Sequence, residues 1–286
     1  MRPLVTAPSS DPLDRPRLQR SSGASRVAYD LRDGTTRLSD LYQRDPCRVL
    51  FPEPEPGEPP QAVLLTTSGG VTGGDALAMA IEIGPGATAV ATTQAAEKVY
   101  RAAPGSGPCR IDVSVRVGEG ATLDWLPQET IVFQGARLQR RTVADVAPGG
   151  ALLACEMVVL GRAASGERFV SGLLLDSWSV RRTDRSQPGR LLWTDALRVE
   201  GETPEGAGFG AANALATVIG VWDEPRQHFE RARALLDGVT EARAAVTLVN
   251  GVMVARVLGE ATAVRRTTIR FLTDFRGRRL PRVWHV

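Results

Sequence analysis

The chain has 286 residues, 43% of them hydrophobic, and a formal net charge of +3 at pH 7. A chain of this length can bury a core without disulfides or a structural metal, and so small an excess of positive charge excludes a nucleic-acid partner from our expectations. The three cysteines lie far apart in the sequence, which fits a reducing compartment better than a disulfide framework. We therefore expect a cytoplasmic protein.

The N-terminal segment is rich in proline and carries no apolar run. This composition is not that of a signal peptide or a membrane anchor, and it predicts a disordered tail over residues 1–20. No stretch of about 18 apolar residues follows, so no membrane association is expected. Residues 21–286 are predicted to form a single domain.

Alternating hydrophobicity predicts strands in most of residues 26–202. Two or three short strands are expected between residues 26 and 51, around a turn at Asp33-Gly34. The proline-rich segment 51–61, FPEPEPGEPPQ, predicts a loop, because proline cannot donate a hydrogen bond to a sheet.

The segment Thr66–Asp75, TTSGGVTGGD, packs four glycines and an aspartate behind an apolar run. It lacks the lysine of a phosphate-binding P-loop. The alternating residues 77–83 that follow predict a strand, whereas a dinucleotide fingerprint would open a helix. Two interpretations remain open: a tight turn in which glycine permits close backbone approach, and a loop in which Asp75 carries out chemistry.

A strand, a glycine turn and a second strand recur three times, as IEIGPGATAV from Ile81, VRVGEGATLD from Val115 and ADVAPGGALL from Ala144. The spacing of the copies is too irregular for a strict solenoid, but the recurrence favours layered or β-helix-like sheets.

Two helices are expected near the C-terminus, over residues 224–237 and 260–275, with Asp223 as the N-cap of the first. Between them, a hairpin is predicted to turn at Asn250-Gly251. The predicted fold class is therefore mainly β, with layered or β-helix-like sheets and two α-helices near the C-terminus.

The sequence contains few of the residues and motifs that enzyme catalysis uses. It has two histidines, His228 and His285, and neither a Gly-x-Ser-x-Gly elbow nor a Cys-x-x-Cys pair. Carboxylates and amides do lie beside apolar strands, and each can be explained as a solvated strand face. If several line one passage, they supply weak, hard oxygen ligands for a metal ion. These residues are Gln94, Glu97, Gln128, Glu129, Glu156, Glu167 and Glu200.

Five motifs occur in a fixed order: TTSGGVTGGD, ATTQAAEKVYRA from Ala91, PQETIVFQGARL from Pro127, LGRAASGE from Leu160, and LPRVW from Leu280. Together they resemble the UreD family of urease accessory proteins, called UreH in some organisms, over residues 18–284. The resemblance implies a cytosolic, non-catalytic maturation factor with a β-rich, helix-decorated fold. It further implies binding to accessory protein F, which recruits the GTPase accessory protein G, and contact with urease apoprotein.

The family is thought to conduct Ni²⁺ through an internal tunnel, so the resemblance implies transient Ni²⁺ and no tightly bound cofactor. The candidate nickel ligands are Asp75, Glu97 and Glu156. Candidate passage-lining or partner-contact residues are Gly69, Gly70, Gly73, Gly74, Thr92, Thr93, Gln94, Lys98, Tyr100, Arg101, Gln128, Glu129 and Glu200. The alternative from another class is a β-barrel enzyme for a small molecule, in which the three candidate ligands act as general acid or base.

Overall fold

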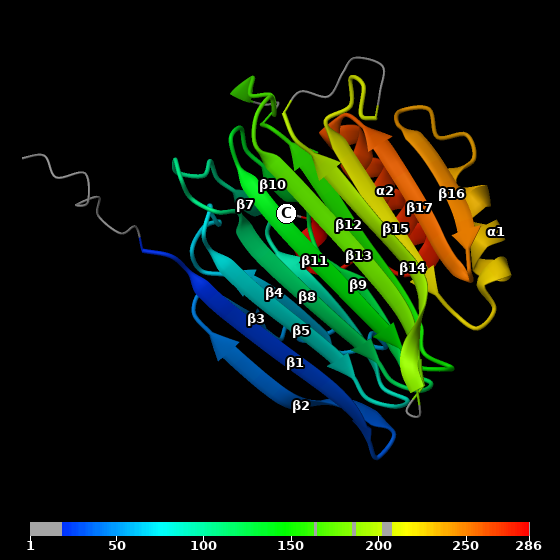
Figure 1. Ribbon diagram of the computed structural model, residues 1–286. Helices are drawn as coiled ribbons and strands as arrows, with labels where there is room; N and C mark the ends of the chain where they lie inside the picture. Colours follow the sequence, from blue (N-terminus) through cyan, green and yellow to red (C-terminus); the bar gives the residue numbers. More distant parts are fainter. Residues whose placement is uncertain (1–18, 163–164, 185–186, 202–207, 286) are drawn as a thin grey trace, which may run out of the picture.

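The computed structural model describes residues 19–162, 165–184, 187–201 and 208–285. Two β-sheets pack face to face, and two helices cover the outer face of one of them (Figure 1). The predicted fold class is confirmed. Almost all of the predicted N-terminal tail, residues 1–18, lies outside the described residues.

The strands of the described residues form a seven-stranded sheet, called sheet A, and a ten-stranded sheet, called sheet B. In spatial order, sheet A comprises β14 (Gln187–Val199), β13 (Leu173–Asp184), β11 (Arg137–Val146), β8 (Cys109–Val117), β5 (Ala76–Ile83), β1 (Ser22–Arg32) and β2 (Thr35–Arg44). Sheet B comprises β16 (Arg243–Val249), β17 (Val252–Gly259), β15 (Ala214–Val221), β12 (Ala151–Leu160), β9 (Thr122–Leu126), β6 (Thr88–Gln94), β4 (Gln61–Thr66) and β3 (Cys47–Leu50), with β10 (Thr130–Val132) and β7 (Glu97–Val99) paired beside them.

The three repeated phrases are the places where the chain crosses from sheet A to sheet B. They join β5 to β6, β8 to β9, and β11 to β12, and these strands pair in parallel within each sheet. The turns stack on one another: the N–H of Gly118 donates to the carbonyl of Ile83 at 2.7 Å. A Cβ at Gly118 would lie 2.8 Å from the nitrogen of Pro85, so glycine is required by the close approach. The centre of the fold is therefore β-helix-like.

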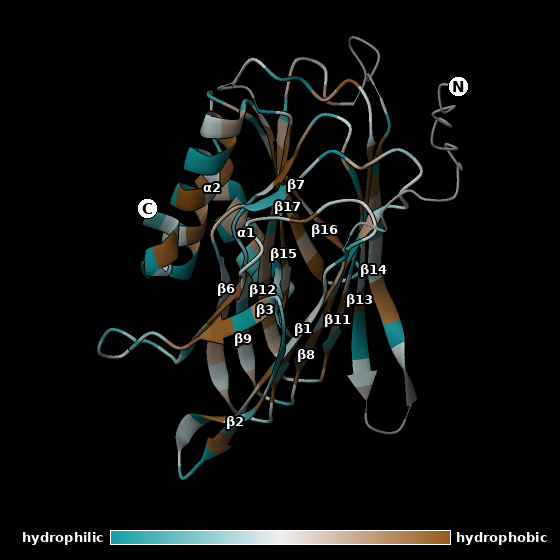
Figure 2. Cartoon of the chain, turned by 90° about the vertical axis from the view of Figure 1, so that its left-hand side faces the viewer, coloured by the Kyte–Doolittle hydropathy of each residue, from teal (hydrophilic) through white to brown (hydrophobic). Residues whose placement is uncertain are grey.

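The molecule has three layers, seen edge-on in Figure 2. One apolar core fills the space between the two sheets, and a second lies between sheet B and helices α1 (Pro225–Leu236) and α2 (Ala261–Arg276). Strand β12 is buried along both faces from Leu152 to Leu160, which explains why its sequence is apolar except at Glu156. A 3₁₀ turn, Arg282–His285, follows α2, and its Trp284 side chain is fully buried in the second core.

The predicted turns are confirmed. Asp33 and Asn250 adopt φ angles of 51° and 49°, at the tips of the β1–β2 and β16–β17 hairpins. The proline-rich segment forms the loop between β3 and β4. Within the described residues, no helix is both long and apolar enough to cross a membrane.

Two local predictions were wrong in detail. Helix α1 begins after Glu224, not Asp223, and no side chain caps its N-terminus. Strands β1 and β2, expected to be short, have 11 and 10 residues. They lengthen because β1 pairs with both β2 and β5, and this second, long-range pairing leaves no mark in the local sequence.

The glycine segment joins β4 to β5. Gly70 has a φ of 142°, and a Cβ there would lie 2.6 Å from the carbonyl oxygen of Lys98. The N–H of the next residue, Val71, donates to that same oxygen at 2.8 Å. Glycine at this position is explained by close backbone approach.

Candidate functional site

Polar and charged side chains gather between the two sheets, inside the first core. They line a cavity of about 50 Å³, called the larger cavity, between β4, β6, β9 and β10 of sheet B and β5, β8 and β11 of sheet A. The polar side chains that line it are Thr66, Thr93, Gln94, Glu97, Gln128, Thr130, Arg140, Thr142 and Glu156. Most of them donate or accept through oxygen, the ligand atom that hard cations favour.

A second interior cavity of about 30 Å³, called the smaller cavity, lies between β12, β13, β14 and β15. Its lining residues are Glu156, Val158, Asp176, Trp178, Asp195, Leu197, Leu215 and Thr217. Because Glu156 lines both cavities, the two adjoin at its carboxylate.

Arg140 connects the two sheets at this junction. Its Nε donates to Asp176 Oδ1 at 3.1 Å and its Nη2 to Asp176 Oδ2 at 2.6 Å, a bidentate pair between neighbouring strands in register. Its Nη1 donates to Thr130 Oγ1 at 2.7 Å, and Glu156 from sheet B forms an ion pair with the same guanidinium. The indole N–H of Trp178 donates to the other oxygen of Glu156.

These charges lie out of the solvent. Arg140 is 8% exposed, Asp176 6% and Glu156 4%, so one guanidinium faces two carboxylates in a buried setting. Buried charges are strongly unfavourable unless they are paired. The trio carries one formal negative charge in excess.

Glu97 lines the larger cavity from β7. Burial raises the pKa of its carboxyl to about 7, opposed by a hydrogen bond from the Thr66 hydroxyl and by the charge of Arg140. The group is therefore partly protonated near neutral pH.

Asp75, the third candidate ligand, is placed differently. Its Oδ1 accepts from the backbone N–H of Ser21 and its Oδ2 from that of Thr72, both at 2.8 Å. The side chain is buried at the end of the glycine segment, and the residues that line either cavity do not include it.

Of the other candidate residues, three line the larger cavity. Thr93 Oγ1 accepts from the backbone N–H of Gln128 at 2.9 Å, and the Gln128 amide donates to the carbonyl of Val283 at 2.6 Å. Gln94 lines both the larger cavity and a groove on the surface.

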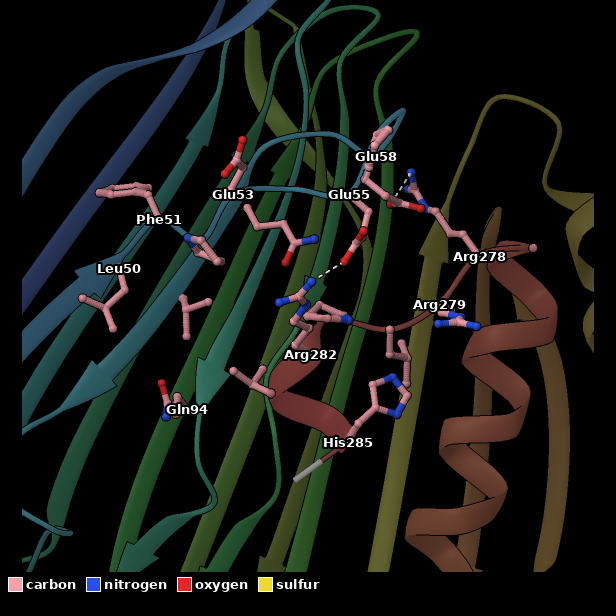
Figure 3. A pocket seen from close by; sticks show the side chains of 18 residues that line it. Leu50, Phe51, Glu53, Glu55, Glu58, Gln94, Arg278, Arg279, Arg282 and His285 are labelled. Carbon is pink, nitrogen blue, oxygen red and sulfur yellow. Dashed lines mark hydrogen bonds and ion pairs between the residues drawn. The ribbon is translucent and has the colours of Figure 1, made fainter.

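That groove has a volume of about 1080 Å³ and lies between the proline-rich loop and the segment after α2 (Figure 3). Glu55 pairs with Arg282 at 2.5 Å and Glu58 with Arg278 at 3.8 Å, so acidic side chains of the loop face basic ones of the C-terminal segment. Through Gln94, the groove adjoins the larger cavity.

The remaining candidates have other contacts. The hydroxyl of Thr92 donates to the carbonyl of Leu126 at 2.6 Å, toward the second core. Glu129 pairs with Arg265 of α2. The Tyr100 hydroxyl donates to the carbonyl of Gly69 at 2.9 Å.

Arg101 and Glu200 are exposed, and Glu200 pairs with Arg198 at 2.5 Å. Lys98 is exposed too, and its backbone carbonyl contacts the glycine segment. Gly73 is packed against the loop before β8, where a Cβ would lie 2.7 Å from the carbonyl oxygen of Gly107. Gly69 and Gly74 have φ angles of 70° and 90° in the same turn.

Sequence reasoning missed Arg140, Asp176, Thr130 and Trp178. One signal was available in the sequence of β11. Arg140 lies on the same inward-facing side of the strand as Leu138, Thr142 and Ala144, and a charged residue at an inward-facing position indicates a buried ion pair. Its partners lie on other strands, and no local pattern predicts them. Among the described residues, no three His, Cys, Asp or Glu side chains gather closely enough to form a ready metal site.

The stacked sheets and charged interior define a β-sheet protein whose polar groups face an internal space. The family model for "UreD urease accessory protein" matches residues 21–285. The chain is 42% identical to Urease accessory protein UreD 1 of Methylobacterium radiotolerans, over 99% of this chain and 98% of the relative. It is 40% identical to UreD 3 of Methylorubrum extorquens, over 97% and 94%, and 38% identical to UreD of Azorhizobium caulinodans, over 94% and 98%. The chain therefore belongs to the UreD family of urease accessory proteins.

Proposed function

We propose that this urease accessory protein is a maturation factor that scaffolds accessory proteins F and G on urease apoprotein and helps to pass Ni²⁺ to the urease active site. The names of its relatives support the urease-related role. The observation that carries the nickel step is the pair of adjoining cavities, lined by carboxylate, hydroxyl and amide oxygens between the sheets.

The chemistry of the lining favours brief binding, because the described residues that line the two cavities include no cysteine or histidine. Burial raises the pKa of Cys47 to about 11 and those of Cys109 and Cys155 to about 12, so the thiols stay protonated at neutral pH and are poor metal ligands. Oxygen ligands with about micromolar affinity release a metal on the order of once per second at an association rate of about 10⁶ M⁻¹s⁻¹. A Cys/His site that binds with roughly 10–16 kcal/mol would hold the metal far longer. Release on this timescale suits a conduit.

The surface groove supports a route into this interior. Gln94 borders both spaces, and Gln128 is hydrogen-bonded to Val283 of the C-terminal segment that forms one wall of the groove. We propose that Ni²⁺ passes between groove and cavity beside these two amides. Asp75, Glu97 and Glu156 remain the candidate ligands, with Glu97 and Glu156 the two that line a cavity.

We propose that the protein is non-catalytic, acts in the cytoplasm and holds no cofactor tightly. The cavity that Glu97 and Glu156 line measures about 50 Å³ and accommodates a few waters, whereas small-molecule sites typically measure about 300–1,000 Å³. The enzyme alternative needs Asp75 beside Glu97 and Glu156, and the Asp75 carboxylate is instead bonded to two backbone amides. GTP hydrolysis is then the task of accessory protein G.

The substitution Glu156→Gln tests the nickel step. It removes the negative charge shared by both cavities while Arg140 keeps its bidentate pair with Asp176, so the fold should be retained. At limiting nickel we expect urease activity in cells, and the nickel content of purified urease, to fall by about 10-fold, the scale on which metal sites respond to the loss of a supporting group.

Glu82→Gln is the matched control, because Glu82 forms an ion pair with Arg116 on the outside of sheet A. It should leave urease activation unchanged, and both variants should still co-purify with accessory protein F and urease apoprotein. Normal nickel loading by Glu156→Gln would contradict the proposed conduit.

A further inference from the structure

Arg140 stands at the boundary between the two interior cavities. Its side chain lines the larger cavity, its partner Asp176 lines the smaller one, and its partner Glu156 lines both. A cation that moves from one cavity to the other beside Glu156 therefore passes close to the guanidinium that pairs with this carboxylate.

A divalent cation would balance the negative charges at this position better than the guanidinium that occupies it. A guanidinium carries a single positive charge, and two buried carboxylates face it. A divalent cation in its place would balance both carboxylates, and uncompensated charge is costly in a buried setting. The single positive charge of Arg140 therefore balances only one of the two carboxylates.

The carboxylates have supports that do not depend on Arg140. Glu156 accepts a hydrogen bond from the indole of Trp178, and Asp176 and Trp178 lie two residues apart on β13 and thus on one face of it. The backbone at Glu156 pairs with Thr217 of β15, and the backbone at Asp176 pairs with β11 on one side and β14 on the other. The two acidic groups are thus held by the backbone of opposite sheets.

A displaced guanidinium has a further carboxylate partner in the lining of the same cavity. Glu97 lines the same larger cavity as Arg140, and the charge of Arg140 lowers its pKa against the opposing effect of burial. The arginine stem is long and has rotatable bonds, so its head group can change partner while its Cα stays in β11.

We propose that Arg140 is the gate of this interior: its guanidinium occupies the cation position between Glu156 and Asp176, and a divalent cation that passes between the cavities displaces it toward Glu97. The inference rests on the proposed function in that the passing cation is Ni²⁺. Arg140 acts through the two carboxylates and is a positioning residue.

Metal rescue of Arg140→Met tests the gate. The full-length variant, co-purified with accessory protein F, is unfolded by heat in the presence of a chelator and then with Ni²⁺ alone. Methionine keeps much of the length and removes the charge, so the two carboxylates are left unpaired and the midpoint temperature should fall. Ni²⁺ at about 100 times its dissociation constant should then raise the midpoint by about 5 °C more than it does for the unmodified protein.

Two control variants separate a gate from an ordinary ion pair. In Arg276→Met the lost arginine side chain is also buried, but its partner Asp124 lines neither cavity and still pairs with Arg278, so Ni²⁺ should give no such rise. Adding Glu156→Gln and Asp176→Asn to Arg140→Met should abolish the rescue. Absence of rescue in Arg140→Met, or equal rescue in Arg276→Met, would overturn the gate.

Arg140→Lys covers the case in which the methionine variant does not fold. Lysine keeps the charge but cannot reproduce the bidentate pair, so a competing cation should displace it more easily. Equilibrium dialysis should show Ni²⁺ bound several-fold more tightly than by the unmodified protein, and equal affinity would contradict the gate.

These measurements need no urease, so the gate and the delivery proposal can fail separately. Rescue of Arg140→Met together with normal nickel loading of urease by Glu156→Gln would keep the cation position and reject delivery. Loss of loading by Glu156→Gln without any rescue would keep delivery and reject the gate.

Discussion

The three candidate ligand carboxylates differ in the groups that their oxygens contact. Both oxygens of Asp75 accept backbone N–H groups within a turn, whereas Glu156 contacts a guanidinium and an indole between two cavities. Glu97 has a weak contact, 3.5 Å, with the Thr66 hydroxyl. The availability of a carboxylate to a passing cation therefore follows its surroundings and not its residue type.

Asp75→Ala should destabilise the protein. Two backbone N–H groups, of Ser21 and Thr72, lose their acceptor, and we expect the free energy of unfolding to fall by about 2 kcal/mol, measured by denaturant titration. An unchanged free energy of unfolding would show that water replaces the carboxylate at no cost.

Asp75→Asn separates this role from nickel binding, because an amide keeps one acceptor oxygen and loses the charge. A ligand role predicts reduced nickel in urease while the complex with accessory proteins F and G still assembles. Full nickel content would leave Asp75 as a turn residue.

At the scale of elements, the stacked turns and the C-terminal segment position the interior. The turns set the distance between the sheets, and the segment after α2 closes sheet B from outside. Asp124 of β9 accepts from Arg276 at 2.8 Å and Arg278 at 2.7 Å, and the indole N–H of Trp284 donates to the carbonyl of Leu126 at 3.1 Å. These contacts fix the groove wall beside Gln128.

Gly118→Ala tests the stacked turns. Its Cβ would meet backbone atoms of residues 83–85 at 2.8–2.9 Å, and backbone in a stacked turn cannot move aside easily. We expect a loss of about 2 kcal/mol in the free energy of unfolding. In Gly107→Ala nothing lies within 4 Å of the new Cβ, and the change should stay within about 0.5 kcal/mol. Equal effects of the two substitutions would mean that the turns do not constrain the sheets.

At the scale of the whole molecule, large apolar side chains are exposed along one edge of the sheets. They come from β2, an outer strand of sheet A, and from β3 and the residue after it, on the corresponding edge of sheet B. The exposed residues are Leu38, Leu41, Tyr42, Leu50 and Phe51. Exposed apolar strand edges promote association between chains.

The isolated chain should therefore aggregate, and co-expression with accessory protein F should increase the soluble fraction, measured by centrifugation and size-exclusion chromatography. Leu41→Lys offers a control, because a charge on an edge strand opposes strand pairing and should improve solubility without the partner. Equal solubility of the unmodified chain with and without accessory protein F would refute the expectation.

Most of the architecture was predictable because it depends on local chemistry. Alternating hydrophobicity predicted the strands, and the dipeptides Asp33-Gly34 and Asn250-Gly251 predicted the two hairpin tips. Helical periodicity predicted α1 and α2 to within one residue at each end. The repeated strand–turn–strand phrases predicted β-helix-like sheets because each phrase is one crossing between sheets. The motifs in their order were sufficient to predict the UreD family.

The interior was decided by tertiary structure alone. Arg140, Glu156 and Asp176 lie on three strands, and they meet because parallel pairing sets β11 beside β13 in register while the packing of the sheets brings β12 opposite. In the sequence, Asp75 and Glu156 are both carboxylates that adjoin apolar residues. In the structure, Asp75 accepts hydrogen bonds from two backbone amides, whereas Glu156 borders two cavities. The sequence specifies which groups can carry a charge. The pairing of distant strands decides which of these charged groups lie together in a buried space. That placement determines whether a carboxylate stabilises a turn or attracts a cation.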